Sequence, residues 1–202
     1  MEKIAVVGFN GRMGRLICKA LQKDYTVLGV GKDNKLDDFK NIDLVVDFAT
    51  HESSLKSAEF CLKRKIPLII GSTGQTEVEN KRIDEISKEI KIIKKANFSR
   101  GIDVLKGVID SVIMLNPLKI EIIEKHHINK KDKPSGTALE LKKYVEKGYN
   151  GEVEIDSIRE GDEMGEHIIV AHLEDEVISI KHNVFSRECF VKGVVEEIKK
   201  IF

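Results

Sequence analysis

Tryptophan is absent from this chain, cysteine and proline occur only three times each, and the net charge is zero because 34 basic residues balance 34 acidic ones. The balanced charge gives no footprint for nucleic acid or for an anionic membrane surface. The odd number of cysteines and the lack of Cys-x-x-Cys spacing argue against a disulfide framework. Because Cys18 and Cys61 lie on helical patterns, we expect them to be buried thiols in a reducing cytosol.

Long apolar runs are missing as well. No segment approaches the roughly 20 apolar residues of a membrane-spanning helix, and residues 1–3 lead directly into a strand pattern, so neither a membrane span nor a signal peptide is expected. No grouping of His, Cys, Asp and Glu has metal-site spacing, so no metal site is predicted. With 202 residues, 41% of them hydrophobic, the chain can bury a core in one or two domains. These features predict a cytoplasmic protein without nucleic-acid, membrane or metal partners.

The most informative segment is residues 124–138, which reads EKHHINKKDKPSGTA. Isoleucine and glutamate alternate just before it, as is typical of a strand, so His126 and His127 should stand at a strand end. Imidazole and ammonium groups can both neutralise an acidic substrate and move protons near neutral pH. The two histidines and the lysines beside them therefore predict an active site.

A helix start follows the two histidines. Pro134 breaks the chain, and Thr137 and Glu140 have the spacing of a capping box, so a helix is predicted to begin near residues 135–137. The free amides and the dipole of a helix start attract a carboxylate or a phosphate. An alternative interpretation treats the histidines as ordinary strand-end residues and the lysines as a solvated loop. The close spacing of the histidines, a lysine and an anion-binding turn favours the active site.

A second candidate site lies near the start of the chain. The apolar residues 4–7 lead into GFNGRMGR at residues 8–15, after which apolar residues recur at helical spacing. A strand, a glycine turn and a helix in this order are the context of a dinucleotide site, where the backbone approaches the pyrophosphate and the helix start binds it. The spacing is G-x-x-G-x-x-G instead of the commoner G-x-G-x-x-G, and the alternative is a simple tight turn.

Strands and helices alternate over the first half of the chain. Strands are predicted at residues 26–30, 44–48, 68–70 and 90–93. Helices separate most of them, over residues 54–63 and after Thr76, which has a capping-box partner in Glu79. This order predicts an α/β fold with a Rossmann-type parallel sheet. The loops at the carboxyl ends of the strands should line a cofactor cleft; they are residues 8–14, 48–50, 71–74 and 96–99.

The pattern changes near Asn97. Closely spaced strands are predicted at roughly residues 119–124, 152–158, 166–173 and 176–182. Apolar residues at helical spacing predict a helix that leads into them and carries Val104, Val108, Val112 and Leu115. A terminal helix is expected within residues 184–202.

Two domains follow from this change. Residues 1–97 should form the dinucleotide-binding domain. Residues 98–182 should form a smaller α+β domain with an open mixed sheet, which binds substrate and mediates oligomerisation. Hinges near Phe98 and His182 would let the domains close on the substrate.

With these residues in view, the chain resembles the dihydrodipicolinate reductases, also called 4-hydroxy-tetrahydrodipicolinate reductases, of bacterial lysine and diaminopimelate synthesis. The resemblance is nearly full length. It implies that the terminal helix returns to the nucleotide domain, so that residues 1–97 and 183–202 together form the dinucleotide-binding domain. Residues 126–137 are similar to the family's H-H-x-x-K-x-D-x-P-S-G-T segment, the most specific of the motifs. The other similar segments are Gly8 to Arg15, Val46-Asp47-Phe48, Gly71-Ser72-Thr73-Gly74, Asn97-Phe98-Ser99, Arg159 to His167 and His182 to Arg187.

The resemblance implies that a nicotinamide hydride is added to a conjugated cyclic imine with two carboxylates, giving tetrahydrodipicolinate. It places His126 as proton donor or acceptor and Lys130 as the second proton donor. The substrate-binding residues that it implies are His127, Ser135, Gly136 and Thr137. The residues that it implies for binding NADPH or NADH are Gly8, Asn10, Gly11, Arg12, Met13, Gly14, Lys32, Phe48, Gly71, Ser72, Thr73, Ala96, Asn97 and Phe98.

The end of the second predicted strand departs from the family pattern. Family members usually carry an acidic residue there that binds the adenosine ribose, whereas this chain reads Val30-Gly31-Lys32-Asp33. Losing the acid while keeping a cation weakens the hydroxyl contact and leaves a partner for a 2′-phosphate. We therefore expect NADPH to be at least competitive with NADH. Family members also usually continue through a short tail with a Gly-Leu-Tyr segment, whereas this chain ends at Phe202.

Several residues are left open by the sequence. His167 and His172 lie on predicted strands and His182 lies near a strand end, where a structural role is the ordinary expectation. Arg187 could pair with a substrate carboxylate or brace the hinge. His51 follows the third strand and belongs to a helix start.

Two other classes of protein share the first site. A regulatory Rossmann protein without catalysis would keep the glycine turn, but it would have no use for His126, Lys130 and the anion-binding turn together. Another enzyme of the same architecture, such as an aspartate or imine dehydrogenase, would act on a different dicarboxylate. The closely spaced strands after residue 150 predict an edge-rich sheet that is covered by self-association, and the resemblance implies a homotetramer.

Overall fold

The computed structural model describes all 202 residues and divides them into two compact units. The first contains residues 1–98 and 191–202, and the second contains residues 99–190. Residues 183–190, which the sequence analysis assigned to the first domain, group with the second unit. None of the helices is both long and apolar enough to cross a membrane.

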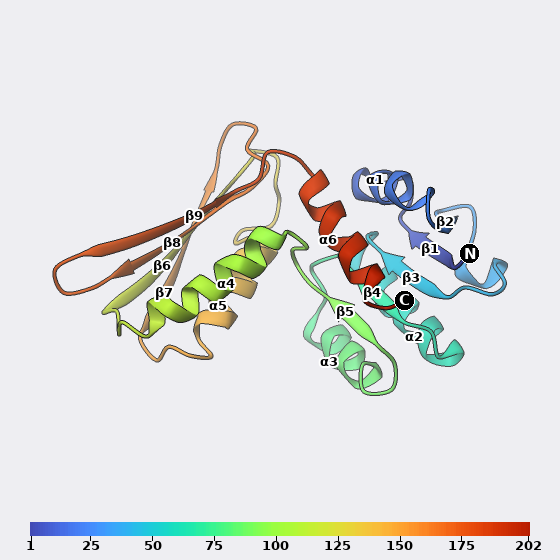
Figure 1. Cartoon of the computed structure of the whole chain (residues 1–202), viewed down its shortest axis with the longest axis horizontal. Coiled ribbons are helices and arrows are strands. Elements are labelled where there is room, and N and C mark those ends of the chain that lie inside the picture. Colours follow the sequence, from blue (N-terminus) through green and yellow to red (C-terminus); the bar gives the residue numbers. More distant parts are fainter. The chain divides into compact units, whose positions relative to one another are not determined.

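The first unit is built on a five-stranded parallel sheet with the order β2-β1-β3-β4-β5 (Figure 1). Its strands are β1 (Lys3–Val7), β2 (Thr26–Val30), β3 (Leu44–Asp47), β4 (Leu68–Ile70) and β5 (Ile92–Lys94). The predicted Rossmann-type sheet is therefore confirmed, with strand ends that differ from the predictions by one or two residues. The chain order reverses between β1 and β3, which is where parallel sheets of this kind bind their ligands.

Helices cover both faces of this sheet. They are α1 (Arg12–Leu21), α2 (His51–Arg64), α3 (Glu77–Ile86) and α6 (Glu188–Lys199), with a short 3-10 turn at Leu36–Asp38. Ala5 and Val45 pack with buried residues of α2 and α3 in one hydrophobic cluster. Their neighbours Ile4 and Leu44 point to the other face, because side chains alternate along a strand. Cys61 of α2 is buried, and burial raises the pKa of its thiol to about 12, so it serves packing.

The second unit is a four-stranded mixed sheet with the order β7-β6-β8-β9, in which only β6 and β7 are parallel. Its elements are α4 (Arg100–Ile113), β6 (Lys119–His126), α5 (Gly136–Val145), β7 (Glu152–Arg159), β8 (Glu166–His172) and β9 (Val177–Asn183). Both helices cover one face, where Ile109, Ile120 and Leu141 are fully buried. On the other face Ile168 and Val170 stay partly exposed. The predicted open mixed sheet is confirmed.

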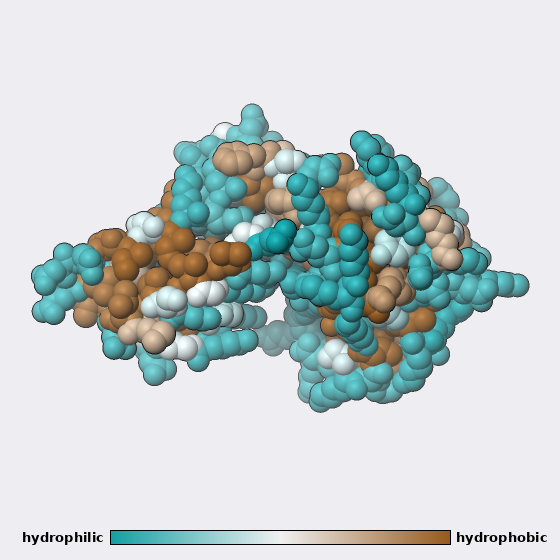
Figure 2. Space-filling model, viewed as in Figure 1, coloured by the Kyte–Doolittle hydropathy of each residue, from teal (hydrophilic) through white to brown (hydrophobic).

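The predicted helix is present as α4, but its buried face is not the row of valines that indicated it. Val104 and Val108 are 67% and 39% exposed, while Ile102 and Ile109 point into the core. The two apolar stripes lie side by side on the helix, so helical spacing alone could not choose between them. Figure 2 shows apolar residues exposed over this part of the second unit.

Candidate active site

The turn after β1 has the geometry of a pyrophosphate cradle. Gly8 has a φ of 82°, a conformation that favours glycine. A Cβ at Gly14 would lie 2.1 Å from the Gly8 carbonyl oxygen, so only glycine lets α1 approach the strand this closely. The helix begins after Gly11, which has no side chain to cap the first amides. Those amides stay available for an anion, so this turn fits the phosphates of a dinucleotide.

The ring of Phe9 shapes the end of β2. A Cβ at Gly29 or at Gly31 would lie 2.8 Å from carbon atoms of that ring. Asn34 closes the same end, since it accepts a hydrogen bond from the Gly31 amide at 2.8 Å and donates one to the Gly29 carbonyl at 3.0 Å. Lys32 follows on the surface. Gly31, which stands where the family usually has an acidic residue, thus leaves room for the bulky ring of Phe9.

The end of β3 is held by Asp47, a residue that the sequence analysis did not single out. Its buried carboxylate accepts hydrogen bonds from the hydroxyls of Ser57 at 2.6 Å and Ser53 at 2.8 Å, and from the Ala49 amide at 3.0 Å. Burial raises the pKa of Asp47, although these three donors oppose the shift. The carboxylate fixes the turn that leads from Phe48 into α2.

The loops after β3 and β4 are joined. Phe48 lies over Gly71, where a Cβ would be 2.1 Å from the ring. The hydroxyls of Ser54 and Ser72 are in contact, and Gln75 donates to the Ser72 carbonyl at 3.1 Å. These contacts explain why the loop after β4 is built from small polar residues.

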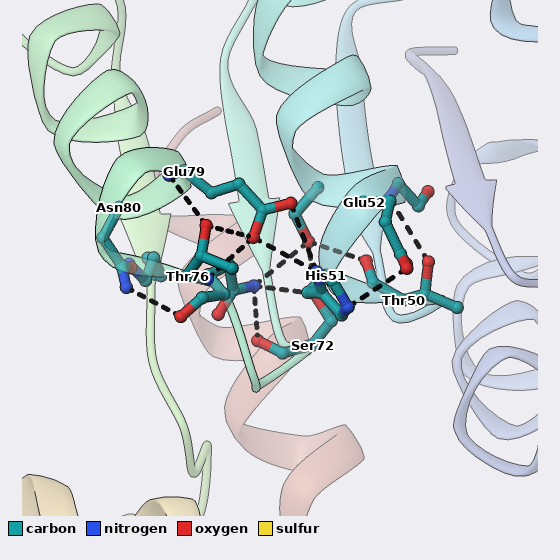
Figure 3. A network of polar contacts seen from close by, with 11 residues as sticks. Thr50, His51, Glu52, Ser72, Thr76, Glu79 and Asn80 are labelled. Carbon is teal, nitrogen blue, oxygen red and sulfur yellow. Dashed lines mark hydrogen bonds and ion pairs between the residues drawn. The ribbon is translucent and has the colours of Figure 1, made fainter.

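A polar network connects the two helix starts beside these loops (Figure 3). Nδ1 of His51 lies 3.1 Å from Oε2 of Glu79, and the same carboxylate accepts from the Thr76 amide at 2.7 Å. The Thr76 amide and hydroxyl, together with His51, hold the pKa of Glu79 below its ordinary value. The capping box predicted for Thr76 and Glu79 is confirmed, and His51 does begin a helix.

The cofactor residues implied by the resemblance all lie in the first unit, in or next to the loops at the carboxyl ends of its five strands. Phe98 and Phe48 are in contact, with ring centroids 5.5 Å apart. Asn97, which precedes Phe98 in the sequence, is buried. The set consists of Gly8, Asn10, Gly11, Arg12, Met13, Gly14, Lys32, Phe48, Gly71, Ser72, Thr73, Ala96, Asn97 and Phe98.

In the second unit, β6 ends at His126, as predicted. The imidazole is 7% exposed, and its Nδ1 lies 2.5 Å from Oε2 of Glu124, which is fully buried. The other oxygen of Glu124 accepts from Nη2 of Arg159 at 2.6 Å and from the Ser135 amide at 3.2 Å. Burial raises the pKa of Glu124, but the hydrogen bonds from His126 and Arg159 outweigh it and hold the pKa well below its ordinary range. The carboxylate is therefore ionised.

Lys130 is bound by a residue that the sequence analysis did not assign. Its Nζ lies 2.7 and 2.8 Å from the two carboxylate oxygens of Asp132. Burial raises the pKa of Asp132, but Lys130 and the Gly136 amide lower it overall. Nη2 of Arg159 also donates to the Asp132 carbonyl at 2.6 Å. The loop that carries Lys130 is thus tied to the end of β7.

The helix start after this loop differs in one respect from the prediction. Ser135, not Thr137, is the N-cap of α5, and its hydroxyl accepts from the Ala138 amide at 3.2 Å. The predicted pairing of Thr137 with Glu140 as a capping box is therefore wrong. Only Thr137 has the capping-box spacing, but Ser135 has the extended backbone that a cap needs. Thr137 is buried in the first turn of the helix.

Three histidines approach one another on β6, β8 and β9. The ring centroids of His126 and His167 are 5.3 Å apart, and those of His167 and His182 are 6.2 Å apart. Burial and the neighbouring histidines lower the pKa of His167 to about 3, so its imidazole is neutral. His182 contacts the Ser99 hydroxyl at 3.1 Å. Two of the three histidines left open by the sequence, His167 and His182, therefore lie close to the candidate active site.

The remaining predicted residues are placed as follows. His127 is partly exposed, and its amide donates to the Glu163 carbonyl at 2.8 Å. His172 pairs with Glu121 at 2.8 Å on the outer face of the sheet. No group of three or more His, Cys, Asp or Glu side chains is arranged to hold a metal ion.

The sequence analysis missed Glu124 and Arg159 as members of the site. A signal was present, because Ile120, Ile122, Glu124 and His126 share one parity along a strand whose inner face is apolar. That parity puts the carboxylate on the same side as the imidazole. Asp132 stood inside the recognised motif, but nothing in its spacing showed that it would bind Lys130.

A Rossmann-type sheet with an open glycine turn, combined with a buried histidine and a lysine, defines a nicotinamide-dependent oxidoreductase. Two family models match the chain. Residues 2–98 match the N-terminal domain and residues 101–202 the C-terminal domain of dihydrodipicolinate reductase. The chain belongs to the dihydrodipicolinate reductase family.

Individual relatives agree with this assignment. The chain is 38% identical to the 4-hydroxy-tetrahydrodipicolinate reductase of Thermosipho africanus, covering 98% of this chain and 91% of the relative. It is 36% identical to the enzyme of the same name from Caldanaerobacter subterraneus, covering 98% and 92%. Among solved structures, the dipicolinate-bound dihydrodipicolinate reductase from a Paenisporosarcina species has a TM-score of 0.75 at 20% identity, covering 100% of this chain and 94% of the other.

Proposed function

We propose that this enzyme reduces 4-hydroxy-tetrahydrodipicolinate to tetrahydrodipicolinate in lysine and diaminopimelate biosynthesis. The observation that carries the proposal is the end of β6, where a buried carboxylate holds His126 next to the start of α5. The substrate has two carboxylates, and a relative with this fold is named as binding dipicolinate, which is also a dicarboxylate. A regulatory nucleotide-binding protein would have no need for this arrangement.

The proposed roles follow from chemistry. The hydroxylated substrate loses water to give a conjugated imine. This imine would accept a hydride from reduced nicotinamide bound in the first unit, so that an enamine-like anion remains on the substrate. The reduction takes up one proton, which His126 donates to this anion, and Lys130 is the second group that can donate it. Lys130 would exchange its partner Asp132 for a substrate carboxylate. The substrate-binding residues in this proposal are His127, Ser135, Gly136 and Thr137.

The cofactor is NADPH or NADH, and we expect NADPH to be at least competitive. The support is the end of β2, where Gly31 takes the usual place of an acid and Lys32 offers a cation to a 2′-phosphate. Lys32→Ala should raise the KM for NADPH and leave the KM for NADH unchanged. A clear NADH preference that the variant does not alter would count against this selectivity.

A coupled assay tests the proposed reaction. The substrate is generated freshly in the cuvette, and the loss of reduced nicotinamide absorbance is followed with the substrate-generating enzyme omitted as the control. We expect oxidation that depends on the substrate. If folded protein that binds cofactor shows no such oxidation but turns over another dicarboxylic imine, the assignment to this substrate is wrong.

A further inference from the structure

Glu124 is the one carboxylate of β6 that has no access to solvent. Both of its oxygens are occupied by donors. Oε2 faces Nδ1 of His126 at 2.5 Å, while Oε1 accepts from Arg159 at 2.6 Å and from the Ser135 amide at 3.2 Å. A buried carboxylate that meets three groups of a candidate active site is costly unless each contact is formed.

We propose that Glu124 is a positioning residue for the reduction, an inference that rests on the proposed function. It holds His126 in the tautomer that carries a proton on Nδ1, so that Nε2 is the atom that exchanges a proton with the substrate. Through Arg159 it also fixes the loop that carries Lys130. One buried carboxylate therefore aligns both proton donors.

The first step concerns the tautomer. An ionised carboxylate can only accept hydrogen bonds, so Nδ1 of His126 must be the donor. Nε2 has no hydrogen-bond partner within the chain. Residue 165 is glycine, and a Cβ there would lie 3.0 Å from Nε2, so the absence of a side chain keeps that atom clear. The ring thus presents one defined nitrogen.

The proton balance follows from this orientation. Protonated His126 carries hydrogen on both nitrogens and gives the Nε2 proton to the substrate anion. Neutral imidazole remains, with its Nδ1 proton still shared with Glu124. The carboxylate accepts the hydrogen bond from Nδ1 both before and after the transfer, so the ring keeps the same tautomer.

The second step concerns Lys130. Nη2 of Arg159 bridges Oε1 of Glu124 and the carbonyl oxygen of Asp132, both at 2.6 Å. The side chain of that aspartate holds Nζ of Lys130 at 2.7 Å. The chain of contacts from Glu124 to Lys130 is continuous, so loss of the oxygen that accepts from Arg159 should loosen the lysine loop.

Glu124→Gln tests the proposal because it keeps the shape of the side chain. The amide oxygen can still accept from Arg159 and from the Ser135 amide, which leaves the amide NH2 facing Nδ1 of His126. Nδ1 must then accept, and the proton moves to Nε2. By analogy with other histidines held in the wrong tautomer, we expect kcat to fall by roughly 10²- to 10⁴-fold. The KM for substrate and the Kd for cofactor should change less than about threefold.

Glu121→Gln is the matched control. It removes the carboxylate of the other Glu–His pair on β6, in which Glu121 lies 2.8 Å from Nε2 of His172 on the outer face of the sheet. We expect its kcat to equal that of the unaltered enzyme. A folded Glu124→Gln enzyme whose kcat is within about threefold of the control would overturn the proposal.

NMR spectroscopy measures the tautomer of His126 directly, and the measurement on the unaltered protein does not depend on how the variant folds. In unaltered protein labelled with ¹⁵N-histidine, neutral His126 should carry its proton on Nδ1, and in Glu124→Gln on Nε2. An Nε2 proton in the unaltered protein would refute the proposal even if the variant failed to fold. Absence of activity in the unaltered enzyme would instead contradict the proposed function and would leave the tautomer measurement valid.

Discussion

His126 and Lys130 differ in their surroundings although only a short loop separates them. The imidazole is buried against a carboxylate, whereas the lysine side chain is 24% exposed and paired with Asp132. The first environment suits a group that moves a proton in one fixed direction. The second suits a group that must also meet an incoming substrate.

Replacing His126 separates chemistry from binding. His126→Ala should lower kcat by about 10²- to 10⁴-fold, with little change in cofactor affinity, because the side chain acts on a proton and not on the nucleotide. Lys130→Ala should lower kcat and also raise the KM for substrate. Steady-state kinetics and cofactor titration measure both effects.

Thr137→Val is the comparison, since it removes a hydroxyl at the anion-binding turn while keeping the shape of the side chain. It should act mainly on KM, because a contact made in the ground state is also made in the transition state.

Near-normal kcat in a folded, cofactor-binding His126→Ala protein would mean that the histidine pair is structural.

At this scale the sequence predicts chemical groups better than their partners. The histidines and Lys130 were recognisable because few other roles need imidazole and ammonium beside a helix start. Glu124 and Arg159 meet only when β6 and β7 pair in parallel register, which places His126 opposite Arg159. That register depends on the whole sheet, so local spacing does not contain it.

At the level of elements, the contact between α1 and β1 depends on a single hydrogen atom. A methyl group at Gly14 would collide with backbone atoms of residues 8 and 9. Gly14→Ala should therefore destabilise the protein by about 1–3 kcal/mol. It should also weaken cofactor binding, because the helix start would move away from its place. Thermal unfolding and fluorescence titration with reduced nicotinamide would measure the two effects.

Gly107→Ala in α4 is the matched substitution, since a Cβ at Gly107 would meet nothing within 4 Å. Alanine is the better helix former, so this variant should be more stable by about 0.5–1 kcal/mol. Equal effects of the two substitutions would show that the close approach at Gly14 is not needed.

The strand β8 makes stability sensitive to acid through His167. In the folded protein the pKa of this buried histidine is about 3, against an ordinary value of 6.5. Between these values the unfolded chain binds a proton that the folded chain does not. His167 therefore costs no stability well above pH 6.5. As the pH drops from 6.5 toward 3, the free energy of unfolding falls by up to about 1.4 kcal/mol per pH unit.

Urea unfolding at about pH 7 and about pH 4.5 checks this slope. His167→Gln should lose less stability than the unaltered protein over that interval, because glutamine does not titrate. Equal losses in the two proteins would mean that other groups cause the acid sensitivity.

Element types were predictable where periodicity and turn signals agreed. The parallel strands and the capping box at Thr76 are examples, because both depend on neighbouring residues alone. The buried stripe of α4 and the cap of α5 were not predictable, since each segment offered two acceptable solutions. Tertiary packing chose Ile102 over Val104, and backbone conformation chose Ser135 over Thr137.

For the whole molecule, the face of the mixed sheet that no helix covers determines the expected oligomeric state. Ile123 pairs with Ile168 on that face, and Val170 lies further along the same strand. Partly exposed apolar residues on an open sheet favour burial against another copy. We expect a homotetramer at micromolar concentration, as the family resemblance implies. Light scattering that gives a single particle of 22.8 kDa, the mass of one chain, would contradict this.

The change from alternating strands and helices to closely spaced strands near Asn97 indicated two domains. The second boundary, where the chain returns to the first unit, could not be predicted. Residues 183–190 connect a strand to a helix and contain no signal that assigns them to one unit. Their grouping depends on which contacts they make in three dimensions. The compact units divide after residue 98 and again after residue 190, and only the first division coincides with a change of local pattern.

The ring of Phe9 limits which residues position 31 can accept. Glycines at 29 and 31 leave room for that ring, and a side chain at either position would come within 2.8 Å of it. An acidic residue at position 31 cannot enter until the ring moves or is replaced by something smaller. The order of mutations therefore matters in evolution and in engineering, because shrinking residue 9 first avoids a strained intermediate that the reverse order passes through.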